Sequence, residues 1–135
     1  IRLREGRDVS IVADGLLVFE ALAAAETLAK DGIQASVIDM HTVKPLDGGL
    51  LIAEAKKTGH VVVAEEHQIW GGLGSAVASF LSRRFPTALE YVAIQDTYAE
   101  SGTAEELFDK YGLSWPHVVQ AAERVVATKK EKLPA

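Results

Sequence analysis

The stretch richest in potential chemistry spans residues 60–80, where two acids and a histidine precede a cluster of glycines. Glu65, Glu66 and His67 follow a short apolar run, and a carboxylate beside a histidine can make the imidazole a proton carrier. Acids and histidine are also metal ligands. Neighbouring residues of a strand point to opposite faces, however, so these three side chains cannot converge on one ion. We therefore favour an interface or turn role for them over an acid/base group or a metal site.

Gly71, Gly72 and Gly74 come next, immediately before Ser75 and a helical pattern. Main-chain N–H groups at a helix start could cradle an anion. No Lys-Ser or Lys-Thr follows the last glycine, and the G-x-G-x-x-G spacing is absent, so this is not a nucleotide phosphate loop. G-L-G-S-A is also not the G-x-S-x-G of a serine hydrolase. Close packing of the helix against the sheet or another chain is the favoured interpretation, and an anion site is the alternative.

Four further candidates lie where strands are expected to end: Asp14, Trp70, Asp96 and Glu100. Asp14 would share a crevice with His67 if the strands that precede them are neighbours. An exposed Trp70 would favour a protein contact, although packing within its own domain is equally compatible. Asp96 and Glu100 could simply cap the helix that follows them.

The elements that must position these residues alternate along the chain. The patterns predict strands over 1–4, 8–13, 34–39, 60–64 and 89–95, and helices over 16–30, 47–57, 73–81, 103–111 and 114–126. Such alternation produces right-handed crossovers and a mostly parallel sheet with helices on both faces. The sequence therefore predicts a three-layer α/β/α domain of about five strands. Ligands of such sheets collect at the carboxyl ends of the strands. We expect the domain to span residues 1–128, with a solvated tail over 129–135.

Composition narrows the class of protein. The 135 residues are 48% hydrophobic and 24% charged, as in an ordinary globular domain, and the net charge of −5 argues against nucleic acid or anionic membrane as partners. No apolar run approaches the roughly 18 residues that span a bilayer. The absence of cysteine excludes disulfides and is compatible with a cytoplasmic protein. The abrupt, Met-free start suggests a piece of a longer chain.

Four segments together resemble the C-terminal domain of the transketolase family. They are DVSIVADG (8–15), IDMHTVKPLD (38–47), AEEHQIWGGLGSAVASFL (64–81) and QDTYAESGTAEELFDKYGLSWPHVVQAA (95–122). The resemblance runs from about Arg7 to Val126 and is strongest to transketolases encoded as separate N- and C-terminal sections. The same type of domain forms the C-terminal part of deoxyxylulose-phosphate synthases and of the β-subunits of 2-oxoacid dehydrogenase decarboxylases. Residues 96–113 favour transketolase, because the decarboxylase β-subunits end differently.

The resemblance implies a five-stranded mixed sheet whose first strand is an antiparallel edge strand. It implies a transferase that moves two-carbon ketol units between sugar phosphates with thiamine diphosphate and Mg²⁺. In that family an N-terminal domain binds the diphosphate and metal, a middle domain binds the pyrimidine ring, and active sites form across a homodimer.

The chain itself lacks the family's cofactor machinery. Ala13-Asp14-Gly15 stands in place of Gly-Asp-Gly, the sequence contains no asparagine, and the activating glutamate belongs to the middle domain. We therefore expect no catalytic, cofactor-binding or metal-binding residue here, and an isolated domain that is inactive. Its expected role is to dock on the other domains and on its copy, through His67 and the glycine loop with Trp70 as anchor, and secondarily through residues 96–102. The alternative is that the chain is not part of an enzyme but a free-standing regulatory module that binds an anion.

Overall fold

The computed structural model describes residues 1–40, 46–68, 72–94 and 114–128. The elements are β1 (Arg2–Arg4), β2 (Val9–Ala13), α1 (Leu17–Lys30), β3 (Ala35–Asp39), α2 (Gly48–Thr58), β4 (His60–Gln68), α3 (Leu73–Arg84), β5 (Ala88–Ile94) and α5 (Trp115–Ala127). The short helix predicted over 103–111 and the predicted tail over 129–135 lie outside the described residues.

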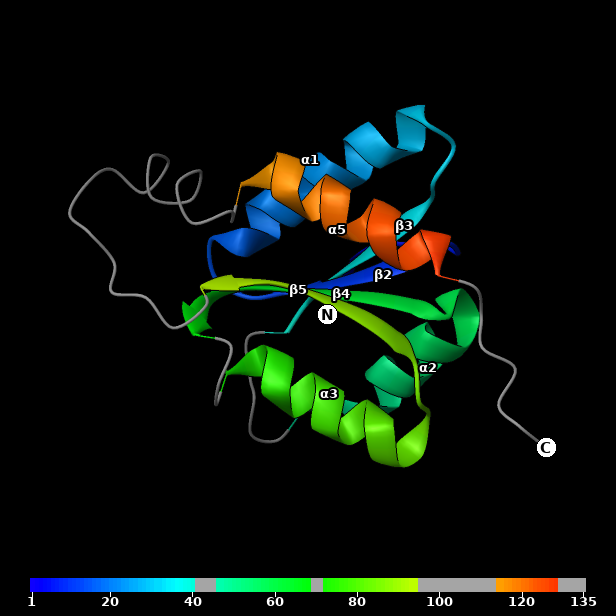
Figure 1. The fold of residues 1–135 in the computed structure, drawn as a ribbon, viewed down its shortest axis with the longest axis vertical. Helices are drawn as coiled ribbons and strands as arrows, with labels where there is room; N and C mark the ends of the chain where they lie inside the picture. The colour runs from blue at the N-terminus through cyan, green and yellow to red at the C-terminus, as the bar shows by residue number, and fades with distance from the viewer. Residues whose placement is uncertain (41–45, 69–71, 95–113, 129–135) are drawn as a thin grey trace.

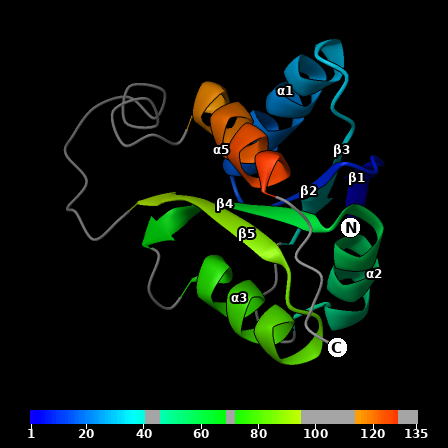
Figure 2. The ribbon, with the colours of Figure 1, turned by 45° about the vertical axis from the view of Figure 1, so that its right-hand side comes forward.

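One sheet with strand order β1-β3-β2-β4-β5 organises the chain. β1 pairs antiparallel with β3, and every other pair is parallel, which confirms the predicted mixed sheet with an antiparallel N-terminal edge strand. Helices α1 and α5 cover one face, and α2 and α3 cover the other (Figure 1). The view turned by 45° shows the same three layers (Figure 2).

Each face of the sheet has its own apolar core, because alternate residues of a buried strand point to opposite sides. Ile11 of β2 packs in the cluster beneath α1 and α5, whereas its neighbour Val12 packs in the cluster beneath α2 and α3. All five residues of β2 are buried, as expected for a central strand covered on both faces. The boundaries of α2 follow the predicted signals, since Asp47 accepts a hydrogen bond from the Leu50 N–H and Gly59 ends the helix at φ 72°.

β4 is longer than the sequence predicted. It continues past residue 64 to Gln68, so the main chain of the acid–histidine segment is strand rather than loop. β4 pairs with β5 up to Ala64 and Val92, and pairs again between Gln68 and Ile94 after a shift in register. That second pairing explains why the strand extends through polar residues, where apolar periodicity gives no signal.

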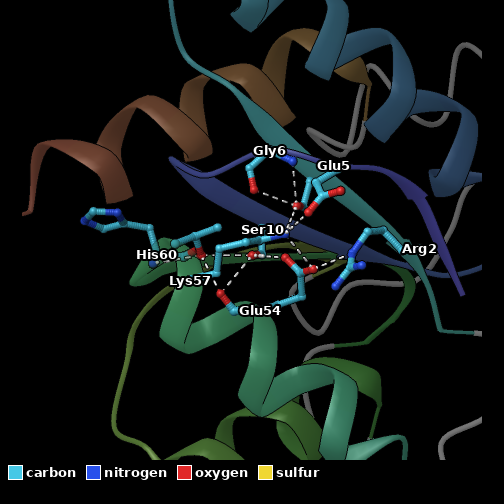
Figure 3. A network of polar contacts seen from close by, with 9 residues as sticks. Arg2, Glu5, Gly6, Ser10, Glu54, Lys57 and His60 are labelled. Atoms are coloured by element: carbon cyan, nitrogen blue, oxygen red, sulfur yellow. Dashed lines mark hydrogen bonds and ion pairs between the residues drawn. The ribbon is translucent and has the colours of Figure 1, made fainter.

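A buried polar network joins β1, β2 and α2 on the α2 side of the sheet (Figure 3). At its centre is Glu54, which is only 1% exposed. Its carboxylate accepts hydrogen bonds from Arg2 Nε at 2.7 Å, Lys57 Nζ at 3.0 Å and Ser10 Oγ at 2.9 Å. Lys57 also donates to Ser36 Oγ at 3.1 Å, which extends the network to β3. A buried charge is tolerated here because each carboxylate oxygen has donors.

Acid should weaken this network. Burial acts to raise the pKa of Glu54, but hydrogen bonds from Lys57, Arg2 and Ser10 outweigh it, and the pKa lies below the ordinary 4.5. The stabilisation is therefore complete above about pH 4.5 and is lost as the pH falls through the lower folded-state pKa. We expect urea unfolding between pH 6 and pH 3 to show a free energy of unfolding that falls below pH 4.5, with a shallower fall in Glu54→Gln. Equal slopes in the two proteins would contradict this assignment.

Candidate functional site at the carboxyl edge of the sheet

The carboxyl edge of the sheet brings together two of the strand ends that the sequence singled out. β2 and β4 are neighbours, and Ala13 lies opposite Ala64. The next residues, Asp14 after β2 and Glu65 within β4, therefore lie close together at the carboxyl edge of the sheet. The Asp14 N–H donates to the Ala64 carbonyl at 3.4 Å. The main chain of Glu66 and His67 lies in β4 at the same edge. Trp70, Gly71, Asp96 and Glu100 lie outside the described residues, so their proposed contact role stays a prediction.

Glu65 provides the cap of helix α3. Its side chain is fully buried, and its two carboxylate oxygens accept hydrogen bonds from the N–H groups of Leu73 at 2.6 Å and Gly74 at 2.8 Å. A carboxylate at this position satisfies N–H groups that have no partner within the helix, and it complements the positive end of the helix dipole. Glu65 therefore fixes the start of α3 against the end of β4.

Sequence reasoning grouped Glu65 with its neighbours and missed this role. A signal was present, because α3 begins after Gly72, which has no side chain to cap the helix. A helix start without Ser, Thr, Asp or Asn needs another acceptor. The nearest acids before this helix, Glu65 and Glu66, were the candidates for that acceptor.

Two glycines make room for this carboxylate. A Cβ at Gly72 would lie 2.5 Å from Glu65 Oε2, and a Cβ at Gly74 would lie 2.7 Å from Tyr91 Cε1 and 3.1 Å from Glu65 Oε1. Residues larger than glycine do not fit at positions 72 and 74, because the side chains of Glu65 in β4 and Tyr91 in β5 pack against the start of the helix. The N–H groups of Leu73 and Gly74, which an external anion would need, already donate to Glu65.

Gly74→Ala should therefore destabilise the domain. Overpacking against Tyr91 costs about 1 to 3 kcal/mol, and the better helix propensity of alanine returns about 1 kcal/mol. We expect the free energy of unfolding, measured in urea by circular dichroism, to fall by up to about 2 kcal/mol. Gly49→Ala is the matched control, because the nearest atom to its new Cβ is 3.9 Å away and the substitution should be neutral or stabilising. Equal effects of both substitutions would contradict the packing explanation.

The charge of Glu65 also affects the neighbouring tyrosine, Tyr91. Burial, together with the negative charge of Glu65, raises the pKa of Tyr91 above its ordinary value of 10. The Tyr91 phenol is thus protonated at neutral pH. Within the described ranges, no group of three histidine, cysteine, aspartate or glutamate side chains is arranged to hold a metal ion. No described helix is long and apolar enough to cross a membrane.

A surface depression of about 400 Å³ lies between α3 and β5. Its lining residues are Ala78, Leu81, Ser82, Pro86, Thr87, Leu89 and Tyr91. Among the described residues that line the depression, only Tyr91 titrates, so these residues provide no acid–base pair.

These features define an α/β domain with a mixed sheet, in which buried carboxylates anchor the two helices α2 and α3. The family model for the transketolase C-terminal domain matches residues 1–118. The chain belongs to the transketolase C-terminal domain family, as its sequence motifs suggested.

Three comparisons place the chain within that family. It is 46% identical, over 127 residues, to a 6-deoxy-6-sulfo-D-fructose transketolase subunit, SqwH, of Clostridium sp. strain MSTE9, covering 94% of this chain and 39% of that protein. It is 38% identical to 1-deoxy-D-xylulose-5-phosphate synthase 1 of Geobacter sulfurreducens, covering 98% of this chain and 21% of the synthase. A solved split-gene transketolase, described as an inactive β4 tetramer, superposes with a TM-score of 0.91 at 46% identity over 96% of this chain and 42% of that one. The chain thus spans about one fifth to about two fifths of the length of these relatives.

Proposed function

We propose that this chain is the C-terminal domain of a thiamine-diphosphate-dependent transketolase that transfers two-carbon ketol units between sugar phosphates. The observation that carries the proposal is the 46% identity to a transketolase subunit over 94% of the chain. Within the enzyme we assign the domain a structural role, docking on the pyrimidine-binding and diphosphate-binding domains of a cytoplasmic homodimer. The buried Glu65 supports this role, because its carboxylate stabilises a helix start and is withdrawn from solvent.

The cofactor does not fit the residues of this domain. Thiamine diphosphate and Mg²⁺ need diphosphate and metal ligands, yet the helix N–H groups of Leu73 and Gly74 are bonded to Glu65. The family's diphosphate motif is Gly-Asp-Gly followed by an asparagine; this chain has Ala13-Asp14-Gly15, no Gly-Asp-Gly and no asparagine. We therefore assign both cofactors to the other domains.

Calorimetry tests this division of labour. The 135-residue chain titrated with thiamine diphosphate and Mg²⁺ should give no saturable heat, whereas the full-length enzyme should bind both. Binding at micromolar concentration by the 135-residue chain would overturn the assignment. Size exclusion over a range of concentrations adds a test of self-association, and a strict monomer would weaken the proposed contact between copies.

A deoxyxylulose-phosphate synthase is the second candidate, favoured by the 38% identity to the Geobacter enzyme over nearly the whole chain. An assay of the full-length enzyme separates the two reactions. Ketol transfer from a ketose phosphate to an aldose phosphate supports transketolase. Decarboxylation of pyruvate with formation of deoxyxylulose phosphate supports the synthase instead.

A further inference from the structure

Large apolar side chains gather at the carboxyl edge of the sheet. Among the described residues, five are exposed: Ile1 (69%), Leu3 (46%), Leu16 (47%), Phe19 (70%) and Trp115 (41%). Exposed apolar residues are ordinary when they are scattered singly, but a group of them marks an interaction surface. All except Leu3 lie at or beside one edge, so their distribution needs an explanation.

The fold places the beginnings of α1 and α5 at this same edge, on one face of the sheet. Leu16 and Phe19 lie at the start of α1, directly after the carboxyl end of β2. Trp115 is the first residue of α5, and the other end of that helix is held at the opposite edge, where the Thr128 carbonyl is 3.1 Å from Nε2 of His60 at the start of β4. In Figure 1 both helices begin on the side where the arrows of β4 and β5 end. We call Leu16, Phe19 and Trp115 the carboxyl-edge patch.

The patch is separate from the core. The buried stripe of α1 includes Val18, Ala21 and Ala25, which pack towards the sheet and α5. Phe19 lies outside this stripe and is 70% exposed. Burying a phenylalanine side chain contributes about 1.5 to 3 kcal/mol, so Phe19 in water forgoes most of that stabilisation. A partner that covers the patch would recover it.

The path of the chain indicates which partner this is. The main chain of Ile1 is held beside Asp39, the last residue of β3, by two hydrogen bonds of 2.8 and 2.9 Å. Because Asp39 marks the carboxyl end of its strand, a polypeptide preceding Ile1 in the longer enzyme proposed above would reach the domain at the same edge as the patch. The transketolase subunit at 46% identity extends well beyond the 39% of its length that this chain matches. A domain tethered at this edge has a high effective concentration there.

We propose that the carboxyl-edge patch is the surface on which the preceding domain of the same polypeptide packs. The inference rests on the proposed function, in which this chain is the C-terminal domain of a longer transketolase. It goes further by assigning the contact to the first turns of α1 and α5, with Phe19 and Trp115 as its two aromatic residues. Aromatic side chains are the residues that anchor such contacts.

Site-specific photocrosslinking in the full-length enzyme tests this contact. Phe19 is replaced by p-benzoylphenylalanine, the enzyme is irradiated, and cross-linked peptides are identified by mass spectrometry. The matched control carries the same amino acid at Glu26, which is exposed seven residues further along the same helix and therefore on the same face. We expect cross-links from the Phe19 position to the preceding domain to be about tenfold more abundant than those from the Glu26 position.

Two results would overturn the proposal: equal cross-linking from both positions, or cross-links only to residues 1–135 of a second copy. A second variant, Phe19→Ser, keeps the test independent of the photoreactive residue. It should speed proteolytic cleavage just before Ile1 by about tenfold, whereas Glu26→Ser should not.

The assay of ketol transfer tests the proposed function separately from the patch. A preceding-domain cross-link in an enzyme without ketol transfer would refute the proposed function and leave the patch standing, and ketol transfer without the cross-link would refute the patch alone.

Discussion

Glu65→Gln is expected to lower the free energy of unfolding of this domain by about 3 kcal/mol. The glutamine keeps the shape of the side chain, but one carboxylate oxygen becomes an NH₂ group that faces the N–H of Leu73 or Gly74. One of the two charge-assisted hydrogen bonds is lost in a fully buried site, and each such bond contributes about 1.5 to 3 kcal/mol. The favourable interaction of the charge with the start of α3 is lost as well.

Urea denaturation followed by circular dichroism measures this change. Glu26→Gln removes the same charge from an exposed position of α1 and should change the free energy of unfolding by less than about 0.5 kcal/mol. A Glu65→Gln effect as small as that of the control would show that the helix start is stabilised by packing alone.

The same substitution has a spectroscopic consequence at Tyr91. Burial and the charge of Glu65 both raise the pKa of this phenol. With the charge removed, the pKa should move back towards 10, and an alkaline titration of tyrosinate absorbance detects the shift. Subtracting the titration of Tyr91→Phe isolates this residue from the other two tyrosines. An unchanged pKa in Glu65→Gln would mean that burial accounts for the whole shift.

Apolar periodicity predicted the order and type of the described elements because all of them except the edge strand β1 bury a definite face or both faces. The run over 8–13 predicts a strand buried on both faces, and the structure has such a strand over Val9–Ala13. The cap at Asp47 and the stop at Gly59 lie directly at the ends of the helix that they bound. Such signals are local, so a single sequence carries them. The family motifs added the antiparallel edge strand, which the alternation of residues 1–4 alone could not orient.

The roles of the two buried glutamates could not be read in the same way. Glu65 caps a helix whose bonded N–H groups are eight and nine residues away, beyond the reach of the usual capping patterns. Glu54 sits on α2, but its partner Arg2 lies 52 residues earlier. The Glu65 role depends on how α3 folds back on the strand before it, and the Glu54 role depends on the sheet, which brings the distant β1 beside α2. The docking role of His67 and Trp70 stays a prediction.

Glu54→Gln should be the second strongly destabilising change, lowering the free energy of unfolding by about 2 to 3 kcal/mol. Removing one partner of a buried ion pair typically costs about 3 to 5 kcal/mol because the other charge is left uncompensated. Here the side chains of Arg2 and Lys57 are 37% and 28% exposed, so water can solvate them in part and the effect falls below that range. Urea unfolding at pH 7 measures it.

Glu5→Gln provides the control, since Glu5 is 72% exposed and 3.6 Å from the same Lys57 ammonium, and it should cost less than about 0.5 kcal/mol. A double-mutant cycle of Glu54→Gln with Arg2→Met then separates the ion pair from the rest of the network. A coupling energy of about 1 kcal/mol or more would show that this pair holds β1 against α2. A coupling energy near zero would mean that the Lys57 ammonium and the Ser10 hydrogen bond are enough to stabilise the Glu54 carboxylate, and that the edge strand depends on its pairing with β3.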